Sequence, residues 1–425
     1  MSDAVHSIDA YTQRLDLQES IGWLIPHLPR QSLISVRGEA DYYGAASEIA
    51  RALGLKTTPL AAASWVHGWA LVRPDNAVAI TGSQPGNRVH LVDRTSTEDT
   101  LVRAGYPNAF AVGLPILYSK VPDLPRRKRS LLLAPFHSLP EITPHNEQKR
   151  NEQEFCEYAV AQRDKYDCIC ASLHSSCVAS RQWIDTLEAH GIPWVLGART
   201  DDENALRRVR TLFASFDCIL TNEVTSVAVY GAFFGARISV SGPAALLPPV
   251  ESFAKHPHYQ RHPELLKNLE LRHPDRLKSL FPFLFAPPDE ATCPHEWASI
   301  EVGEKHVMAD AEIARLLGWR YVDGDPVWAG VDRRNGLATF GWLPPQIGSQ
   351  DMLEKVAQVL APELKSEVDV VNHLKVQRDA VKTLGKEVRA AKVASTELAT
   401  IKKSWAWRLL AKPLFSIEKR LRGLR

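Results

Sequence analysis

A polar turn in the second half of the chain separates a short apolar run from a helix-forming segment rich in Ala and Gly. The first N–H groups of a helix have no partner inside the helix, and they lie at the positive end of its dipole. Hydroxyl side chains at this point are suited to holding a phosphate or diphosphate group. The turn offers three hydroxyls for phosphate and two candidate contacts to ribose or base: Thr221, Thr225, Ser226, Asn222 and Glu223. An ordinary capped helix accounts for the same residues, so the turn by itself leaves both interpretations open.

Two more turns place a histidine and a serine near the carboxyl end of an expected strand. His137 and Ser138 follow the run LLLAPF, and Glu141 lies three residues further on. His174 and Ser175 follow the apolar run CICASL, and a helix is expected after them. A donating imidazole beside a helix N-terminus favours an anion, so both histidines are candidate phosphate ligands. Glu141 is a candidate contact to a hydroxyl group and a catalytic candidate, although a self-satisfying polar loop explains it as well.

His67 is the candidate catalytic base in the first half of the chain. It lies in a loop beside Gly68, between Trp65 and Trp69. An imidazole with a pKa near neutrality can take the proton of a sugar hydroxyl while that oxygen attacks. A structural histidine packed between two tryptophans is the alternative.

Metal chemistry and the common cofactor motifs have little support in the sequence. Four histidines, each close to a proline, lack the paired spacing typical of zinc sites: His256, His258, His262 and His273. The chain has no Walker loop, no GxGxxG after a strand and no GxSxG motif. Kinases, dinucleotide dehydrogenases and α/β-hydrolases therefore lose their main signatures, and we expect neither a metal nor a cofactor.

The first 125 residues predict a small α/β block that positions His67. Strands are expected over 32–37, 78–80 and 89–92, and helices over 45–53 and 97–104. Gly54 and Gly105 follow the two helices, as C-terminal caps do. A proline-rich basic stretch, VPDLPRRKRS, closes the block.

Residues 126–319 predict a second α/β block that positions the phosphate candidates. Strands are expected over 131–134, 168–173, 194–196, 218–220 and 238–240, and helices over 151–163, 179–189, 203–213 and 227–234, before an irregular or short-helical stretch from residue 253. Regular alternation predicts a parallel sheet, so two such blocks predict two Rossmann-like, doubly wound domains. Ligands of such sheets bind beyond the carboxyl ends of the strands. We therefore expect the active site in the cleft between the blocks.

The last hundred residues have a different character. Residues 320–348 contain turn signals and predict an irregular connector with a small hairpin. Residues 349–403 predict a long polar helix or coiled coil, because apolar residues recur at three- and four-residue steps. Pro362 and Gly385 interrupt this pattern. The segment is a candidate element for homo-oligomerisation.

The terminal residues 404–425 predict a basic amphipathic tail. Residues 401–425 hold eight basic side chains and one acid, interleaved with tryptophan, leucine and phenylalanine. Basic residues attract anionic lipid, and aromatic residues anchor at the headgroup level. The candidate membrane contacts are Lys402, Lys403, Trp405, Trp407, Arg408 and Lys412. Docking of the tail on its own domain or on a partner is the alternative.

The overall composition is that of a globular protein with no general affinity for nucleic acid. The 425 residues carry 51 basic and 49 acidic side chains, so no strong basic field surrounds the protein. The six cysteines lack paired CxxC spacing, which fits a reduced setting. The polar first residues lack a signal-peptide core, and no apolar run reaches the roughly 20 residues of a membrane span. We expect a cytoplasmic protein, peripheral on the inner face of the plasma membrane.

Several short segments together resemble bacterial glycosyltransferases of surface-polysaccharide biosynthesis (O-antigen or capsule) with a GT-B architecture. The segments are modest one by one, but their order along residues 42–319 is fairly specific. They are His67–Trp69, Ala111–Pro115 with Tyr118, Leu133–Pro140, Leu173–Cys177, Thr221–Asn222, Tyr230–Ala236, Pro282–Phe285 and Glu296–Trp297.

This resemblance implies an acceptor domain in residues 1–125, a nucleotide-sugar domain in residues 126–319 and usually no catalytic metal. It implies that His174 and the helix start at Thr225 and Ser226 contact the donor phosphate. Similar transferases often carry proline where Ser175 stands, and the turn at Thr225 lacks an expected glycine, so the donor stays open.

We therefore expect an enzyme that moves a sugar from a nucleotide-sugar donor to a lipid-linked or growing surface polysaccharide, with His67 as the base. Two alternatives remain open. One is a non-catalytic scaffold of polysaccharide biosynthesis built on the same body, which should bind no nucleotide sugar. The other is a different transfer onto polysaccharide, such as pyruvyl transfer.

Overall fold

The computed structural model describes residues 15–71, 76–82, 85–86, 88–136, 145–246, 250–254, 259–260, 263–321, 328–332 and 337–341. Residues 1–344 form one compact unit. His137, Ser138 and Glu141 lie outside the described residues, as do the helix expected over 349–403 and the basic tail over 404–425. The proposed membrane contacts and the oligomerisation element therefore remain predictions.

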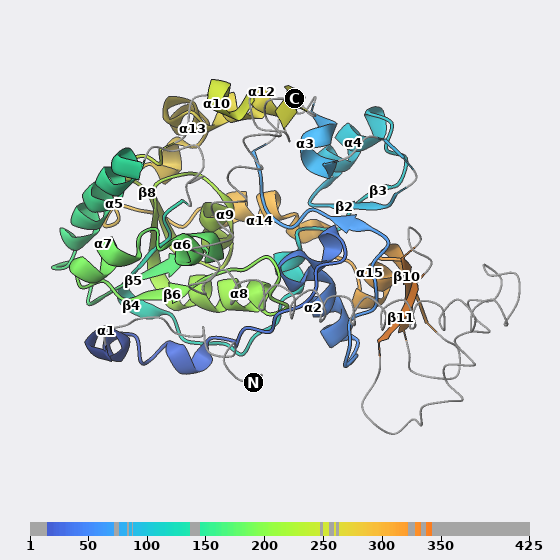
Figure 1. The fold of residues 1–425 in the computed structure, drawn as a ribbon, viewed down its shortest axis with the longest axis horizontal. Coiled ribbons are helices and arrows are strands. Elements are labelled where there is room, and N and C mark those ends of the chain that lie inside the picture. Colours follow the sequence, from blue (N-terminus) through green and yellow to red (C-terminus); the bar gives the residue numbers. More distant parts are fainter. Residues whose placement is uncertain are drawn as a thin grey trace, which may run out of the picture. The chain divides into compact units, whose positions relative to one another are not determined.

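The described chain is a mixed α/β protein with two parallel sheets (Figure 1), which confirms the predicted class. The first sheet has the order β1-β2-β3, with β1 at Ser64–Trp65, β2 at His90–Val92 and β3 at Ala109–Ala111. The second has the order β6-β5-β4-β7-β8, with β4 at Arg127–Leu133, β5 at Cys168–Leu173, β6 at Trp194–Leu196, β7 at Phe216–Thr221 and β8 at Arg237–Val240. All pairs within these two sheets are parallel.

The second sheet is doubly wound because the chain runs outward from β4 to β6 and then returns to the other side of β4. Its strands are apolar on both faces, as strands covered on both sides must be. Leu131 and Leu133 pack in one buried cluster with Phe155 of α5, while Leu132 packs in another with Ala228 of α9. The surrounding helices are α5 (His145–Val160), α6 (Ser175–Ser180), α7 (Ile184–Ala189), α8 (Ala205–Ser215) and α9 (Ser226–Phe233). The strands predicted for this block are confirmed.

The prediction of one continuous helix over 179–189 is wrong. Helix α6 ends at Ser180, and α7 begins at Ile184 after a turn in which Arg181 and Trp183 have φ of 56° and 72°. The buried ring of Trp183 packs edge-on against Phe155, with centroids 5.6 Å apart. Burial of this large side chain stabilises the break, which local helix propensity does not reveal.

Two strands predicted for the first block are also wrong. Residues 32–37 form only an isolated antiparallel bridge, because the Ser32 N–H donates to Asp202 Oδ1 at 2.8 Å and Leu33 pairs with Asp202. Residues 78–80 belong to the short helix α3 (Ala77–Thr81). Its start is capped by Asn76, whose side chain accepts from the Ala79 N–H, and it ends at Gly82 in the left-handed conformation. These two capping residues are helix signals that outweigh the short apolar run between them.

Helix α4 (Thr95–Arg103) packs on β3, and Ile49 of α2 (Ala45–Ala52) belongs to the same buried cluster as Trp65 and Leu91 of the first sheet. Both helices lie close to their predicted bounds. Helix α15 (Asp310–Leu316) packs on α2, and the Leu317 carbonyl accepts from the Ala62 N–H at 2.8 Å. Buried residues of both blocks form one continuous hydrophobic cluster, for example Trp65 with Tyr230 and Trp319. The division of this unit at residues 125 and 319 stays a proposal.

The remaining elements are short. They are α1 (Leu15–Ser20), η1 (Ile25–His27), η2 (Glu39–Gly44), η3 (Pro115–Tyr118), α10 (Val250–Ala254), η4 (Pro263–Leu265), α12 (Leu266–Leu269), η5 (Glu270–Arg272), α13 (Pro274–Leu280), η6 (Pro282–Leu284), α14 (His295–Val302), η7 (Glu304–His306), β9 (Trp319–Tyr321), β10 (Trp328–Asp332) and β11 (Leu337–Gly341). The antiparallel pair β10–β11 confirms the predicted hairpin.

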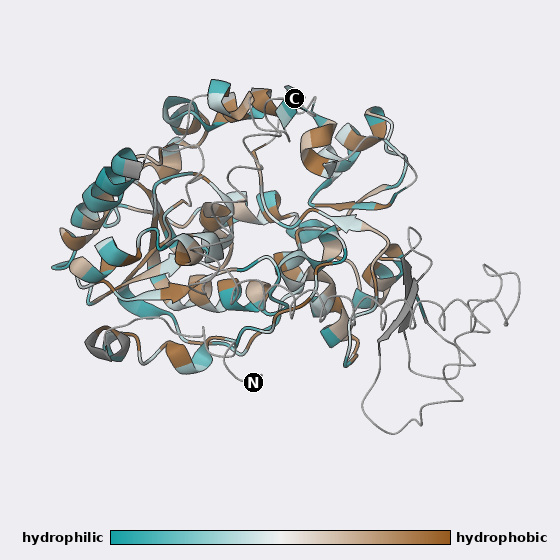
Figure 2. Ribbon diagram, viewed as in Figure 1, coloured by the Kyte–Doolittle hydropathy of each residue, from teal (hydrophilic) through white to brown (hydrophobic). Residues whose placement is uncertain are grey.

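Hydrophilic residues dominate α5 in Figure 2, whereas its buried face carries Phe155, Cys156 and Ala159. Within the described part of the chain, no helix is both long enough and apolar enough to span a bilayer.

Candidate functional site

A cavity of about 760 Å³ lies at the carboxyl ends of both parallel sheets. From the first sheet it is lined by residues that follow β1 and β2, including His67 and Asp93. From the second sheet it is lined by residues that follow β4, β5 and β7, including Phe136, His174 and Ser226. Because the loops after β4 and β7 flank the point where the strand order reverses, the cavity has the position expected of a ligand site in a doubly wound fold.

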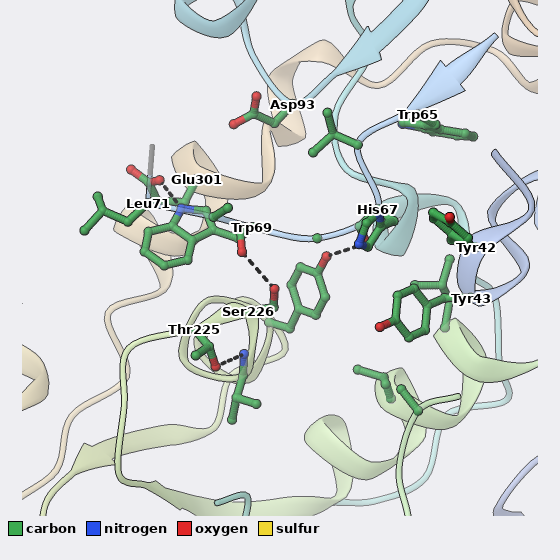
Figure 3. Close-up of a pocket in the computed structure, with 18 of the residues that line it drawn as sticks. Tyr42, Tyr43, Trp65, His67, Trp69, Leu71, Asp93, Thr225, Ser226 and Glu301 are labelled. Carbon is green, nitrogen blue, oxygen red and sulfur yellow. Dashed lines mark hydrogen bonds between the residues drawn. The ribbon is translucent and has the colours of Figure 1, made fainter. Parts of the chain in front are cut away.

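His67 lies in this cavity between aromatic side chains (Figure 3). Its ring contacts Tyr42 edge-on at 5.2 Å between centroids and Tyr43 at 5.4 Å. The side chain is exposed to the cavity, but the surrounding protein lowers its pKa by burial. The imidazole is therefore neutral at pH 7 and has a lone pair with which to accept a proton.

The turn that carries the two tyrosines beside His67 contacts the second block. The Tyr43 N–H donates to the Thr200 carbonyl at 2.8 Å, and Tyr43 itself has a φ of 56°. Gly44 follows with a φ of 77°, and a Cβ at that position would lie 2.2 Å from the Glu203 carbonyl oxygen. This close approach requires glycine, so the turn that carries the two tyrosines packs tightly against the second block.

A pair of carboxylates on the first-sheet side of the cavity was not foreseen from the sequence. Asp93, directly after β2, contacts Arg94 at 3.2 Å, and Arg94 bonds Glu301 of α14 at 2.8 Å. Glu301 also accepts a hydrogen bond from the indole N–H of Trp69. Burial raises the pKa of Asp93, and this effect is opposed by the hydrogen bond from Thr97 and by the charge of Arg94. Asp93 is therefore a second candidate base, and its place after an expected strand was the signal that could have identified it.

Helix α9 begins on the opposite side of the cavity, as Figure 3 shows. Thr225 caps it, because its hydroxyl accepts from the Val227 N–H at 3.3 Å. Ser226 donates to the Trp69 carbonyl at 3.0 Å, and a Cβ on Gly68 would lie 3.0 Å from the Ser226 hydroxyl oxygen. The loop that holds His67 therefore contacts the start of α9 directly.

His174 lies in the same cavity and caps α6. Its Nδ1 accepts from the Ser176 N–H at 3.2 Å and lies 2.8 Å from the Ser176 hydroxyl. Since Nδ1 accepts from a backbone N–H, the neutral ring carries its proton on Nε2. His174 thus has the tautomer that a donor to an anion requires.

Not all the predicted site residues come together. His67, His174, Thr225 and Ser226 line the large cavity, whereas Ser175, Thr221, Asn222 and Glu223 do not. Thr221 is buried and donates to the Glu223 carbonyl at 3.3 Å. Asn222 and Glu223 line a separate, smaller cavity on the other side of the turn. Among the described residues, no group of three or more His, Cys, Asp or Glu side chains could hold a metal ion.

His90 gives the first block a testable dependence on pH. The buried ring of His90 lies 2.7 Å from the Ser64 hydroxyl through Nδ1, and burial, with the charge of Arg88, lowers its pKa to about 4. The unfolded chain binds this proton near pH 6.5, so the stabilisation is present above pH 6.5 and is lost as the pH falls towards 4. We expect the free energy of unfolding to drop by about 3 kcal/mol over this range through His90.

The measurement is urea unfolding at several pH values for the native chain and for His90→Gln. The difference in unfolding free energy between the two proteins should shrink between pH 6.5 and 4. A difference that is constant with pH would exclude His90 as the source of the effect.

Comparison with known proteins identifies no family for this chain. No protein-family model matches it, and no curated protein sequence matches it significantly. Among solved structures, UDP-GlcNAc 2-epimerase from Methanocaldococcus jannaschii is similar over 54% of this chain and 61% of its own, with 14% identity and a TM-score of 0.27. A protein assigned as a UDP-N-acetylglucosamine 2-epimerase, from Listeria monocytogenes, is similar over 60% of this chain and 75% of its own, with 13% identity and a TM-score of 0.27. The match spans less than two thirds of the first structure, and likeness at this level carries no conclusion about the activity of this chain.

Proposed function

We propose that the protein is a glycosyltransferase that takes its sugar from a nucleotide-sugar donor. The observation that carries this proposal is the single cavity at the carboxyl ends of both sheets. Candidate bases line it from the first sheet, and hydroxyls, an imidazole and a helix start line it from the second. A transfer reaction needs both kinds of group, one to activate the acceptor and one to stabilise the leaving phosphate.

In the proposed reaction the acceptor hydroxyl oxygen attacks the anomeric carbon of the donor sugar. The bond between that carbon and the phosphate oxygen breaks, and the phosphate leaves with the electron pair. His67 takes the hydroxyl proton, and Asp93 is the alternative base. The negative charge on the phosphate is stabilised by His174 Nε2–H, by the Thr225 hydroxyl and by the positive end of the α9 dipole. The Ser226 hydroxyl, which donates to the Trp69 carbonyl in this structure, turns to the phosphate when the donor binds.

The proposed acceptor is a lipid-linked or growing bacterial surface polysaccharide, of the O-antigen or capsule type. The proposed setting is the inner face of the plasma membrane, reached through the basic tail at residues 404–425. The acceptor is proposed from the sequence resemblance alone. The membrane setting is also proposed from the sequence alone, because the tail lies outside the described residues.

The proposed donor site predicts that a nucleotide raises the thermal stability of the protein. A ligand that binds only the folded state raises the unfolding temperature, so UDP, GDP, CMP and dTDP should be compared in a thermal-shift screen. We expect one of them to stabilise the native chain clearly more than the others. If none does, the alternative of a non-catalytic scaffold is favoured over an enzyme.

Ser226→Ala and Thr225→Val should weaken binding of that nucleotide by about 10- to 100-fold, since a hydrogen bond to a charged group contributes about 1.5–3 kcal/mol. Ser180→Ala is the matched control, because Ser180 is an exposed helix hydroxyl outside the cavity. Calorimetry measures the affinities. Unchanged affinity in both cavity variants would remove the start of α9 from the donor site.

A further inference from the structure

A second cavity, of about 70 Å³, lies on the other side of the turn that precedes α9. It has no role in the reaction described above. Its walls are Asn222, Glu223, Val240, Ser241, Gly242, Ala244, Ala245, Arg272, Pro274, Leu277 and Phe285. Most of these side chains are apolar, and the polar ones are Asn222, Glu223, Ser241 and Arg272.

Asn222 and Glu223 are both buried, and in each side chain only one of the two polar atoms has a hydrogen-bond partner. Asn222 is 5% exposed, and its Oδ1 accepts from the Phe136 N–H at 2.8 Å. Glu223 is 3% exposed, and its Oε1 accepts from Arg272 Nε at 2.6 Å. Asn222 Nδ2 and Glu223 Oε2 have no hydrogen-bond partner among the described residues.

Buried polar groups without partners are rare in folded proteins, because each loses its bonds to water on folding. Two residues in the cavity wall thus have one unused donor, on Asn222, and one unused acceptor, on Glu223. A group that fits must present an acceptor to Asn222 and a donor to Glu223. Burial raises the pKa of Glu223, and the pair of bonds from Arg272 to Oε1 opposes this shift by favouring the charged carboxylate.

The small cavity adjoins the large one through Phe136. The Phe136 N–H bonds Asn222, and the guanidinium of Arg272 lies 4.7 Å from the centroid of the Phe136 ring. Phe136 itself lines the large cavity. A ligand whose phosphate lies at the start of α9 therefore has the small cavity beside it.

Size and wall chemistry narrow the group that the small cavity accepts. The volume admits only a few non-hydrogen atoms, and Val240, Leu277 and Phe285 present apolar surface to them. A secondary amide combines a carbonyl acceptor and an N–H donor in such a small unit.

We propose that this cavity binds a secondary amide group of the donor, with the amide carbonyl accepting from Asn222 Nδ2 and the amide N–H donating to Glu223 Oε2. The proposal rests on the proposed function, because it assumes a nucleotide-sugar in the large cavity. Two parts of such a donor carry this chemistry: the N–H and C=O edge of a nucleobase such as uracil, and the acetamido group of an N-acetylated sugar.

The test compares matched ligands by calorimetry on the full chain. One pair is a nucleotide-linked N-acetylglucosamine and the corresponding nucleotide-linked glucose, on the nucleotide that stabilises the protein most. The other pair is uridine and 3-methyluridine, which lacks the N–H. Free N-acetylglucosamine and glucose form a third pair that contains no nucleotide.

Three variants accompany the native chain. Asn222→Asp keeps the acceptor for the Phe136 N–H but replaces the unused donor with an oxygen, and Glu223→Gln removes the charged acceptor. Asn204→Asp is the matched control, because both polar atoms of Asn204 are bonded and it lines neither cavity. Circular dichroism checks that each variant is folded.

We expect the native chain and Asn204→Asp to prefer the amide-bearing member of one pair by at least tenfold. The first pair or the third identifies an acetamido group, and the second identifies a nucleobase edge. Asn222→Asp and Glu223→Gln should lose this preference while binding the amide-free ligand within twofold of the native chain.

No preference in any pair, or a preference that persists in both variants, would overturn the proposal and leave the cavity to buried water only. Failure of the proposed function looks different. In that case no nucleotide or nucleotide-sugar binds, whereas a preference in the second or third pair that depends on Asn222 and Glu223 would still support the amide site.

Discussion

His67→Ala should lower the rate of sugar transfer by about 100- to 10,000-fold, the usual contribution of a general base. Nucleotide binding should survive, because His67 lies with the residues of the first sheet and the proposed phosphate ligands lie on the second. The fall should appear in kcat, since the proton is transferred only as the new bond forms. Steady-state kinetics with the donor found in the thermal-shift screen, together with calorimetry, measures both quantities.

His27→Ala is the matched control for this variant, because His27 is an exposed histidine that does not line the cavity. Asp93→Asn separates the two candidate bases. If His67 is the base, Asp93→Asn should retain most of the activity and keep the native pH profile. Full turnover in His67→Ala combined with loss of turnover in Asp93→Asn would transfer the role to Asp93.

Gly303→Ala should destabilise the protein by about 3–5 kcal/mol, which is large for a single added methyl group. Gly303 ends α14 with a φ of 75°, and a Cβ there would lie 1.8 Å from the Asp93 carbonyl oxygen. The end of α14 would have to move away from β2, and the bond from the Leu114 N–H to the Val302 carbonyl, now 2.8 Å, would be disturbed. Urea unfolding measures the loss.

Gly82→Ala separates the two causes of this effect. Gly82 also ends a short helix with a positive φ, of 60°, but a Cβ there meets nothing within 4 Å. It should cost only about 1–2 kcal/mol, the cost of the left-handed backbone. Equal losses in the two variants would show that the contact between Gly303 and Asp93 has no steric importance. Any folded Gly303→Ala protein should also lose activity, because Glu301 of α14 accepts from the Trp69 indole and so holds the loop that carries His67.

The second sheet was predictable because its evidence is local. Each strand is a short apolar run between turn residues, and each helix has its own start and end signals. The strands predicted over 168–173 and 194–196 have the same bounds in the structure. The first block was harder, since its strands have only two or three residues and carry a weak pattern.

The wrong predictions concern segments whose structure depends on distant parts of the chain. Residues 32–37 have the composition of a strand, but their backbone bonds go to the loop at Asp201–Glu203, about 170 residues away. Nothing within the segment specifies that partner. The break at Trp183 likewise depends on a pocket beside Phe155 that forms only when α5 and the sheet have assembled.

The amino-acid sequence by itself determined that this is an α/β chain with hydroxyl- and imidazole-bearing turns at the ends of parallel strands, because strand period and turn chemistry act over a few residues. Only the tertiary structure decided which of these turns share a cavity. The hydrogen bonds from Ser226 to Trp69 and from Trp69 to Glu301 join residues 157 and 232 positions apart. The tertiary structure also places Asn222 and Glu223, which belong to the same turn as Thr225, in the wall of the smaller cavity. Such contacts depend on the packing of whole elements against one another, which no local pattern encodes.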